Sequence, residues 1–454
     1  MRDPSPRDIA LSLQPPKRKT AKPGPGLEYR WTVLVVAFFG VFGALGFGRF
    51  GYSAVLPSMQ KALGISSAAA GSLASWNLAG YTVMAAIGGV LAAKLGPRRV
   101  ITGGIAVTAA GMLITGLSHE LALASFGRLI TGVGNGLVLV PSVTLMARWF
   151  DAQRLGFASS VVSTGSSLAL VLVGLAVPRL IAAGGAGGWR LAWFMFAGIT
   201  SVVAILSGVF QRDKPAGPVS TEEAELAVYQ AAPANLRARL PRPSLELKRI
   251  LRSGYAWHLG SVYMFYGLAF LIYFTFFQKR LTGDLGYSGN VAGYLFLIVG
   301  VAGLLGGPLW GSVSDRIGRK FTIALMLIMG GLSSLLFGLR PTTPSLVISC
   351  LLFGSSGPAI PGLVGATCSE KFGYRLASAS LGFVTILVGI GQTIGPYLGG
   401  VMGDAFGSLG PTYLFSAGLF VVAALAAAAL GEGGLDTGER TQILPPLPER
   451  RTVK

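Results

Sequence analysis

The sequence is poor in charge and in cysteine. Only 12% of its 454 residues are charged and 18 are acidic, whereas typical soluble domains carry about 25% charged residues. The two cysteines, Cys350 and Cys368, lie 18 residues apart in one apolar run. If that run is one helix they are about 27 Å apart, too far for a disulfide. We therefore expect neither a soluble domain nor a disulfide framework.

Motifs of common enzymes are also missing. The sequence has two histidines, no Cys/His spacing of the zinc type and no G-x-x-x-x-G-K-[ST] phosphate-binding loop. We expect a protein that is not an enzyme, with no cofactor and no metal site. Any transport would then be secondary rather than driven by ATP.

Apolar residues and glycine are abundant instead. The chain is 52% hydrophobic, contains 66 glycines and has a mean hydropathy of +0.63. A bilayer-spanning helix needs about 20 mostly apolar residues, and twelve such runs can be marked. We predict an all-α polytopic membrane protein with twelve transmembrane helices in two six-helix pseudo-repeats. The runs are 31–58, 71–93, 99–117, 121–147, 155–182, 189–210, 255–278, 288–312, 321–339, 344–368, 376–402 and 411–430.

Polar segments divide these runs. Residues 1–30 are polar and lack the apolar stretch and cleavage site of a signal peptide. The segment between the sixth and seventh runs is charged and proline-rich. The expected organisation is a disordered cytoplasmic tail over 1–30, an N-terminal six-helix bundle over 31–210, a cytoplasmic linker over 211–254, a C-terminal six-helix bundle over 255–430 and a cytoplasmic tail over 431–454.

The net charge of +19 is unevenly distributed. With the N-terminus inside, the inner segments hold 29 Lys and Arg residues and the outer loops hold 6, while Arg49 and Arg128 lie within runs. This positive-inside bias predicts an inner-membrane protein with both termini in the cytoplasm, in contact with lipid. The same distribution argues against nucleic-acid binding, because the basic residues form no single patch.

Short motifs recur in the two halves at an offset near 221 residues. Gly89-Val-Leu-Ala-Ala-Lys-Leu-Gly96 matches Gly311-Ser-Val-Ser-Asp-Arg-Ile-Gly318, and Pro141 matches Pro361. Parallel six-helix repeats are one way in which secondary transporters are built, with the substrate between the halves near the midplane.

These residues resemble the Major Facilitator Superfamily (MFS) across nearly all of 31–430. Gly311-Ser-Val-Ser-Asp-Arg-Ile-Gly-Arg-Lys320 resembles the family's cytoplasmic loop motif, and Arg128-Leu-Ile-Thr-Gly-Val-Gly134 its fourth-helix arginine motif. The stretch around Arg49-Phe-Gly-Tyr52 is similar to a bacterial subgroup of mostly uncharacterised members, and Ala147-Arg-Trp-Phe150 to carboxylate-transporting members. The resemblance implies the MFS fold and places helices one, four, seven and ten around a central cavity.

The first cytoplasmic loop departs from the family pattern. It has Ala93 where the family usually has aspartate, and Pro97 where it has arginine. In the family this loop braces the closed cytoplasmic side through charge pairs and a helix terminus, so Ala93 puts the first-half brace in doubt. The residues expected to act in gating are Gly89, Gly96, Arg98, Gly311, Asp315, Arg316, Gly318, Arg319 and Lys320.

Two arginines lie inside runs, at similar expected depth. Arg49 is 18 residues into the first run, and Arg128 is seven residues into the fourth, which enters from the other side. No Asp or Glu falls well inside any run. Buried charges in a bilayer usually face the protein interior or a wet cavity, and Arg binds carboxylate or phosphate bidentately. The pattern predicts an anion site, although Arg128 can instead bond backbone carbonyls and Arg49 can extend toward the interface.

Other polar residues within runs extend the candidate site. Tyr263, Tyr266 and Tyr273 fall within about 80° on a helix, which suits either ligand contact or packing. Asn77, Tyr81, Asn135 and Gln392 can equally join helices, and His258 is the one side chain within a run that titrates near neutral pH. The predicted substrate-binding residues are Arg49, Arg128, Tyr52, Tyr263, Tyr266, Tyr273 and Asn135.

A Gly-Pro motif near the C-terminus is the last sequence motif that resembles one of the family. It resembles an antiporter-type motif of the family, here in the eleventh run rather than the fifth. Its small residues permit close helix packing, and its proline removes a backbone donor. The predicted helix-packing residues are Gly391, Gly395, Pro396, Gly399 and Gly400.

Together these features predict a monomeric secondary transporter that works by alternating access on a small organic anion such as a mono- or dicarboxylate. A proton is one candidate coupling ion, carried by the substrate itself in the absence of membrane carboxylates. Two alternatives stay open: efflux of drug-like or amphipathic compounds, and a non-transporting sensor or receptor on the same fold.

Overall fold

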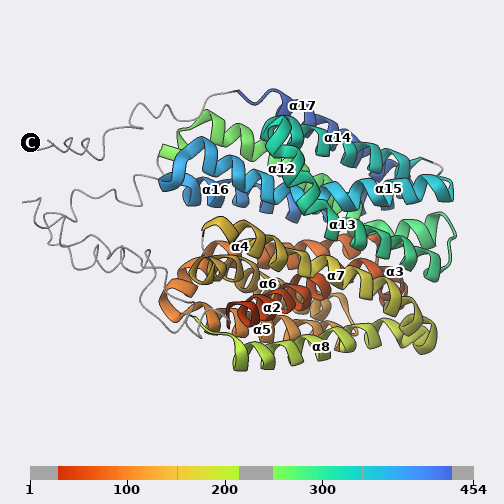
Figure 1. Ribbon diagram of the computed structural model, residues 1–454. Helices are drawn as coiled ribbons and strands as arrows, with labels where there is room; N and C mark the ends of the chain where they lie inside the picture. The colour runs from red at the N-terminus through yellow and green to blue at the C-terminus, as the bar shows by residue number, and fades with distance from the viewer. Residues whose placement is uncertain (1–28, 151, 214–248, 340, 432–454) are drawn as a thin grey trace, which may run out of the picture.

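The computed structural model describes residues 29–150, 152–213, 249–339 and 341–431. Almost all of the predicted tails, 1–30 and 431–454, and most of the predicted linker, 211–254, lie outside the described residues. The described segments are helical and connected by short turns. Figure 1 shows them as two bundles lying side by side, one built from the first half of the chain and one from the second.

The first half forms six crossings. A single first crossing contains α2, η1 and α3, and a 3-10 turn, η2, separates the last two crossings. The elements are α2 (Tyr29–Val41), η1 (Phe42–Phe50), α3 (Gly51–Leu63), α4 (Ser67–Leu95), α5 (Pro97–Leu117), α6 (Leu121–Trp149), α7 (Ala152–Gly184), η2 (Gly185–Gly187) and α8 (Gly188–Phe210).

The second half forms the other six. Its tenth crossing begins in α15 and continues through η4 into α16, which also contains the eleventh. The elements are α12 (Gly254–Lys279), η3 (Arg280–Asp284), α13 (Gly289–Ile317), α14 (Arg319–Gly338), α15 (Thr343–Ser356), η4 (Gly357–Ala359), α16 (Ile360–Phe406) and α17 (Gly410–Ala428).

Eleven described stretches are long and apolar enough to span a bilayer, and one of them, Arg154–Phe210, contains two crossings. Its 57 residues would extend for about 86 Å as a single helix, nearly three times the hydrocarbon thickness of about 30 Å. The chain turns at Gly185, where φ is +51°. The prediction of an all-α membrane protein with twelve crossings in two six-helix halves is thus confirmed.

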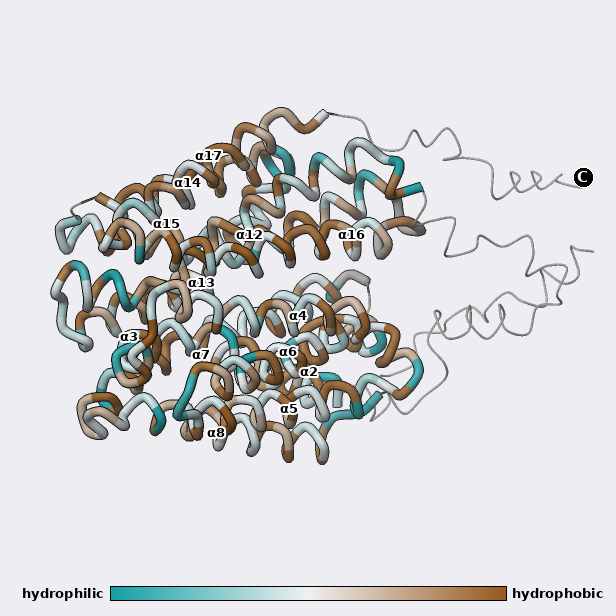
Figure 2. Tube along the Cα trace, turned by 180° about the vertical axis from the view of Figure 1, so that it is seen from behind, coloured by the Kyte–Doolittle hydropathy of each residue, from teal (hydrophilic) through white to brown (hydrophobic). Residues whose placement is uncertain are grey.

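The apolar surface of the bundle is consistent with a lipid surround. Ile205 in α8 and Leu425 in α17 are each 67% exposed. Such exposure of large apolar side chains is unfavourable in water but not in lipid. Figure 2 shows hydrophobic residues along the lengths of the helices and hydrophilic segments recurring at their ends.

The two halves are joined mainly at one end of the bundle. We call this end the Gly64 side, after the turn that follows α3, and the opposite end, where α2 begins, the Tyr29 side. On the Gly64 side a Cβ atom at Gly71 in α4 would lie 2.1 Å from the Pro396 carbonyl oxygen in α16. Likewise a Cβ atom at Gly174 in α7 would lie 2.4 Å from the Gly293 oxygen in α13.

Hydrogen bonds reinforce the junction on the Gly64 side. The Asp404 carboxylate accepts from the backbone N–H groups of Ser67 and Ala68, both at 2.7 Å, at the start of α4. Lys279 in α12 donates to the Ser67 hydroxyl. A carboxylate at a helix N-terminus is stabilised by the unpaired amides and the helix dipole. A hydrogen bond from Arg49 to Gln392 also joins the halves, at greater depth.

Close glycine packing also holds each half together. A Cβ atom at Gly132 in α6 would lie 1.9 Å from the backbone oxygen of Asn77 in α4, whereas Gly103 in α5 has no atom within 4 Å of its Cβ position. We therefore expect Gly132→Ala to lower the free energy of unfolding by about 1–3 kcal/mol, as overpacking does. Gly103→Ala should leave stability unchanged or raise it by up to about 1 kcal/mol, the helix-propensity difference.

Thermal unfolding of the two purified variants in the same detergent tests this packing. Equal melting temperatures for Gly132→Ala and Gly103→Ala would contradict the close approach of α4 and α6.

Candidate functional site

The first crossing contains a widened helical segment at mid-depth. In η1, Phe42–Phe50, the hydrogen bonds run five residues apart, and the N–H of Gly51 donates to the Gly46 oxygen. Glycine permits this segment to lie close to its neighbours, since a Cβ atom at Gly46 would lie 2.1 Å from that of Ala169 in α7. Such π-helical turns are frequent at functional sites, and this one ends one residue after Arg49.

Arg49 projects from this segment toward the other half of the molecule. Its half-buried guanidinium donates to the Gln392 side-chain oxygen in α16 at 2.8 Å. It also lies over the rings of Phe50 and Tyr81, at 5.2 and 5.0 Å from their centroids. The Nε atom is buried without a hydrogen-bond partner. Ion pairs elsewhere in the described chain involve Arg280 and Arg319, and none involves Arg49.

Several tyrosine side chains interact with the charge of this guanidinium. Tyr81, Tyr263 and Tyr266 interact with it electrostatically. Tyr263 and Tyr266 stack with their centroids 5.6 Å apart, and the Tyr266 hydroxyl donates to the Gly357 oxygen at 2.8 Å. The Tyr263 hydroxyl has no hydrogen-bond partner among the described residues. The site therefore offers a cation and at least one unused hydroxyl donor, which suits an anionic ligand.

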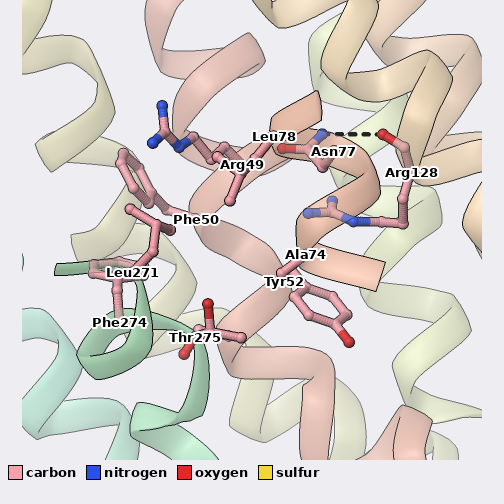
Figure 3. A pocket seen from close by; sticks show the side chains of 11 residues that line it. Arg49, Phe50, Tyr52, Ala74, Asn77, Leu78, Arg128, Leu271, Phe274 and Thr275 are labelled. Atoms are coloured by element: carbon pink, nitrogen blue, oxygen red, sulfur yellow. Dashed lines mark hydrogen bonds between the residues drawn. The ribbon is translucent and has the colours of Figure 1, made fainter. Parts of the chain in front are cut away.

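Arg128 is fully buried and is bound within the first half of the molecule. Its guanidinium donates to the Gly48 oxygen at 2.6 Å and to the Leu73 oxygen at 3.3 Å. It also lies 4.6 Å from the Tyr52 ring centroid. Figure 3 shows the Arg49 side chain extending away from Arg128 and Tyr52. Arg128 therefore bonds backbone carbonyl oxygens, as one of the two sequence interpretations expected, and supports the widened segment η1. Arg49 faces the other half of the molecule.

A cavity of about 10 Å³, enough for about one water molecule, lies between the two arginines. Phe50 from the first half and Phe274 from the second meet at its wall, with ring centroids 4.6 Å apart. This aromatic contact closes one wall of the cavity. The lining residues are Arg49, Phe50, Tyr52, Ser53, Ala74, Asn77, Leu78, Arg128, Leu271, Phe274 and Thr275.

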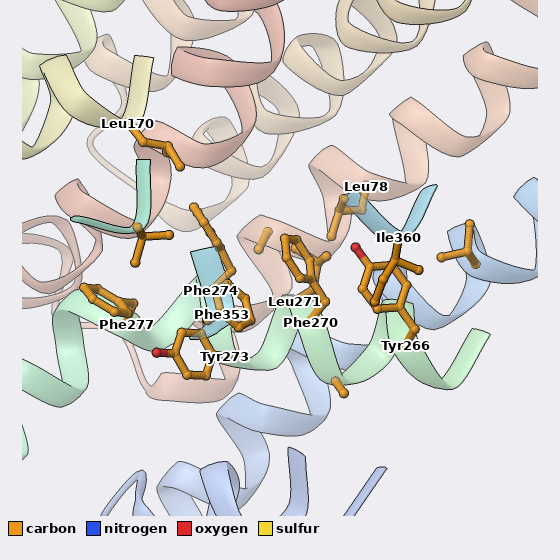
Figure 4. Packing of buried hydrophobic residues seen from close by; sticks show 14 of the residues in the cluster. Leu78, Leu170, Tyr266, Phe270, Leu271, Tyr273, Phe274, Phe277, Phe353 and Ile360 are labelled. Carbon is orange, nitrogen blue, oxygen red and sulfur yellow. The ribbon is translucent and has the colours of Figure 1, made fainter. Parts of the chain in front are cut away.

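The other predicted binding residues lie in packed regions. The Tyr52 hydroxyl donates to the Ala70 oxygen at 2.6 Å. Tyr273 is fully buried, bonds to the Ser349 hydroxyl at 2.8 Å and stacks on Phe353, as Figure 4 shows. These two tyrosines are occupied by helix packing.

Asn135 is fully buried beside Thr108. With its amide nitrogen turned to donate, it bonds the Thr108 hydroxyl and the Thr131 and Ala44 oxygens, so it connects three helices of the first half. Of the predicted residues, Tyr263 and Tyr266 interact with the charge of Arg49, Tyr52 lines the same cavity with its ring against Arg128, and Tyr273 and Asn135 are packed elsewhere.

Two residues next to Arg49 were not assigned to the site from the sequence. Tyr81 and Gln392 were recognisable only as polar residues within apolar runs. Their pairing with Arg49 depends on α4 and α16 crossing at this depth, where Gly389 lies against Thr82, with its Cβ position 2.4 Å from a Thr82 methyl carbon. The one signal in the sequence was that Gln392 directly follows Gly391 of the Gly-Pro packing motif, which indicates close helix packing at that position.

The second-half cytoplasmic loop motif forms a small ion-pair cluster on the Tyr29 side. Arg319 pairs with Asp315 at 2.8 Å and with Glu370 of α16 at 2.9 Å, and bonds the Ser314 hydroxyl. Gly318 precedes α14 with φ +89°. Gly311 has nothing within 4 Å of its Cβ position, and Lys320 lies 5.7 Å from the Phe321 ring centroid. Arg316, exposed at the end of α13, completes the motif.

In the first half a different carboxylate serves the corresponding loop. Gly96 has φ +87° and precedes α5, as Gly318 precedes α14. The backbone N–H of Arg98 donates to Asp213 at 2.6 Å, and the Arg98 side chain bonds the Gly208 oxygen. Asp213, beyond the end of α8, therefore caps α5, whereas Ala93 cannot and Gly89 has no close neighbour.

The Gly-Pro motif of α16 lies at the contact between helices and halves. Cβ atoms at Gly391 and Gly395 would lie 2.2 and 2.6 Å from backbone oxygens of α12, and one at Gly399 would lie 3.0 Å from the Phe276 ring. Gly400 faces Ser67 of α4, and the Pro396 carbonyl faces Gly71.

The two arginines should differ in their effect on stability. Arg128→Ala leaves two buried carbonyl oxygens without a donor, so we expect the free energy of unfolding to fall by about 2–4 kcal/mol. Arg49→Ala loses one hydrogen bond and removes an unpaired charge, so stability should change by less than about 1 kcal/mol. Thermal unfolding in one detergent compares them. A larger loss for Arg49→Ala than for Arg128→Ala would contradict this assignment.

Comparisons with known proteins identify the family. The sequence profile of the Major Facilitator Superfamily matches residues 37–282 and 270–442. The chain is 26% identical to MFS transporter asaE of Aspergillus flavus over 90% of this chain and 88% of that protein. It is 21% identical to the probable sulfoacetate transporter SauU of Cupriavidus necator, over 83% and 88%. It is 26% identical to monocarboxylate transporter 13 of Rattus norvegicus, over 89% of each.

A shorter match covers 32% of this chain and 37% of Multidrug resistance protein 1 of Bacillus subtilis, at 29% identity. Among solved structures, a point mutant of the nucleoside transporter NupG superposes with a TM-score of 0.67 at 15% identity, over 89% of this chain and 99% of that one. A bacterial homolog of the human lysosomal transporter Spinster gives 0.65 at 15% identity, over 90% and 97%. These structures share the fold. The chain belongs to the Major Facilitator Superfamily and is a multi-pass membrane transporter rather than an enzyme.

Proposed function

We propose that this transporter moves a small organic anion, a mono- or dicarboxylate, with Arg49 as the group that binds the carboxylate. The observation that carries the proposal is the environment of Arg49. Its guanidinium has one amide oxygen and two aromatic faces as partners, and no ion pair within the described residues. A charge at this depth costs about 2.5–3.5 kcal/mol, which a bound anion would offset.

The surroundings supply the rest of an anion site. The Tyr81 ring lies against Arg49 from α4, and the Tyr263 side chain, on α12 of the other half, interacts with its charge. A solute held between these side chains would contact both halves, as alternating access requires. Two relatives carry names that specify organic anions, sulfoacetate in one and monocarboxylates in the other, which favours the same substrate class here.

Orientation follows from the distribution of basic residues. We infer that the Tyr29 side faces the cytoplasm of an inner membrane, because the segments predicted there, tails and linker included, carry 29 of the 37 Lys and Arg residues. The junction on the Gly64 side then seals the outer face, and the Arg49 site would exchange solute with the cytoplasm. With no carboxylate beside Arg49, a coupling proton would travel on the substrate.

Fusion of reporters to the C-terminus tests the orientation. A green fluorescent protein fused after Lys454 should fluoresce, and alkaline phosphatase at the same position should be inactive, because both report a cytoplasmic terminus. The opposite pair of results would reverse the assignment of the two sides.

Uptake into liposomes tests the anion site. The purified protein should accumulate at least one of ¹⁴C-labelled pyruvate, succinate and sulfoacetate, and Arg49→Ala should lower kcat/KM about tenfold or more. That factor corresponds to about 1.4 kcal/mol, the lower end for a hydrogen bond to a charged group. Lys61→Ala, exposed on the same crossing, is the matched control and should transport normally. Unchanged uptake by Arg49→Ala would exclude Arg49 as the binding group.

Efflux of drug-like compounds is the second candidate, because α12 is rich in aromatic residues and a partial match carries a multidrug resistance name. Cells with and without the protein should then differ in tolerance to a panel of lipophilic cations and dyes. Equal tolerance across the panel would remove this candidate.

A further inference from the structure

Gln392 is the one side chain from the second half that hydrogen-bonds to Arg49 in the described structure. Its side-chain oxygen accepts from the guanidinium at 2.8 Å, and only 8% of the residue is exposed. The backbone of α16 is closely held here. Gly391 and Gly395 lie against α12, and Gly389 lies against Thr82 of α4. The amide is thus directed at Arg49 by a packed helix rather than by a mobile loop.

The amide oxygen offers Arg49 the same kind of contact that a carboxylate would, but more weakly. A neutral amide presents one oxygen without charge, whereas a carboxylate presents two oxygens in bidentate geometry and a negative charge. Charge-assisted hydrogen bonds are roughly twice as strong as neutral ones. An incoming carboxylate can therefore displace Gln392, while a glutamate at this position could not be displaced so readily.

The same contact also joins the two halves. Hydrogen bonds between the halves on the Gly64 side involve Ser67 and Ala68. The bond between Arg49 and Gln392 lies deeper. Asp404, which caps α4 on the Gly64 side, follows Gln392 on the same helix. Release of Gln392 would remove the hydrogen bond that ties α16 to the first half at mid-depth.

We propose that Gln392 is an internal substitute for the substrate: it occupies Arg49 when the site is empty, holds the Gly64 side closed, and is displaced by the substrate carboxylate. This inference rests on the proposed function for the choice of carboxylate as the displacing group. Its part in holding the halves together does not depend on which solute is carried.

Two substitutions of Gln392 separate these roles in an uptake assay with ¹⁴C-pyruvate. Gln392→Ala removes the competitor for Arg49, so the KM for pyruvate should fall about tenfold, corresponding to about 1.4 kcal/mol. Gln392→Glu places a carboxylate of the same length against Arg49, so uptake should be lost while the melting temperature is maintained or raised. Gln60→Glu, which adds the same charge on α3 away from the site, is the matched control and should transport like the parent.

A second measurement needs no substrate. Nitroxide labels at Leu95→Cys in α4 and Ile317→Cys in α13, both exposed on the Tyr29 side, report the distance between the halves by electron paramagnetic resonance. The native cysteines are fully buried and should not label. Without substrate, Gln392→Ala should shift the distance distribution toward shorter values, and Gln392→Glu should keep the parental distribution even when 10 mM pyruvate is added.

The outcomes separate this inference from the proposed function. Arg49-dependent pyruvate uptake with an unchanged KM in Gln392→Ala would overturn the inference and leave the proposed function standing. If the parent transports none of the carboxylates, a shift in the ligand-free distances of Gln392→Ala still supports Gln392 as the contact that closes the empty carrier. Ligand-free distributions identical to the parent in both Gln392 variants would overturn it.

Discussion

The site depends on one charge: the Arg49 guanidinium lies between the two halves and has no carboxylate partner among the described residues. Arg49 cannot lose its charge, and the low dielectric around it makes an unpaired charge costly. The structure meets this cost in part with one amide oxygen and two aromatic faces. The remaining capacity for hydrogen bonds, including the buried Nε atom, is what makes an anion the natural ligand.

The two intramembrane arginines have different structural roles. Arg128 bonds the backbone of Gly48 and Leu73, so its charge is satisfied inside the first half and it supports the widened turn next to Arg49. That turn directs Arg49 toward α16, where Gln392 meets it. One arginine therefore shapes the backbone, and the other remains available to the interface between the halves.

The scarcity of acidic residues was sufficient to single out Arg49 and Arg128 from the sequence, and the length of the apolar runs was sufficient to predict the twelve crossings. The distinction between Arg49 and Arg128 was not accessible, because both lie at similar depth and differ only in which carbonyl oxygens come near. Tyr273 shares a helix face with Tyr263, yet it packs on Phe353, which depends on where α15 lies. Tyr81 and Gln392 join the site because glycines let α4 and α16 approach closely, a contact between segments some 300 residues apart. The Asp213 cap on α5 was missed for the same reason, since it comes from beyond α8.

The central claim is that a carboxylate binds at Arg49 between Tyr81 and Tyr263. It is tested most directly by a crystal structure of the protein soaked with bromoacetate, whose bromine scatters anomalously. The account predicts one anomalous peak within about 5 Å of the Arg49 guanidinium, with the Gln392 amide displaced. Anomalous peaks elsewhere with none near Arg49, or the Arg49–Gln392 bond intact in a crystal that holds bromoacetate elsewhere, would contradict it.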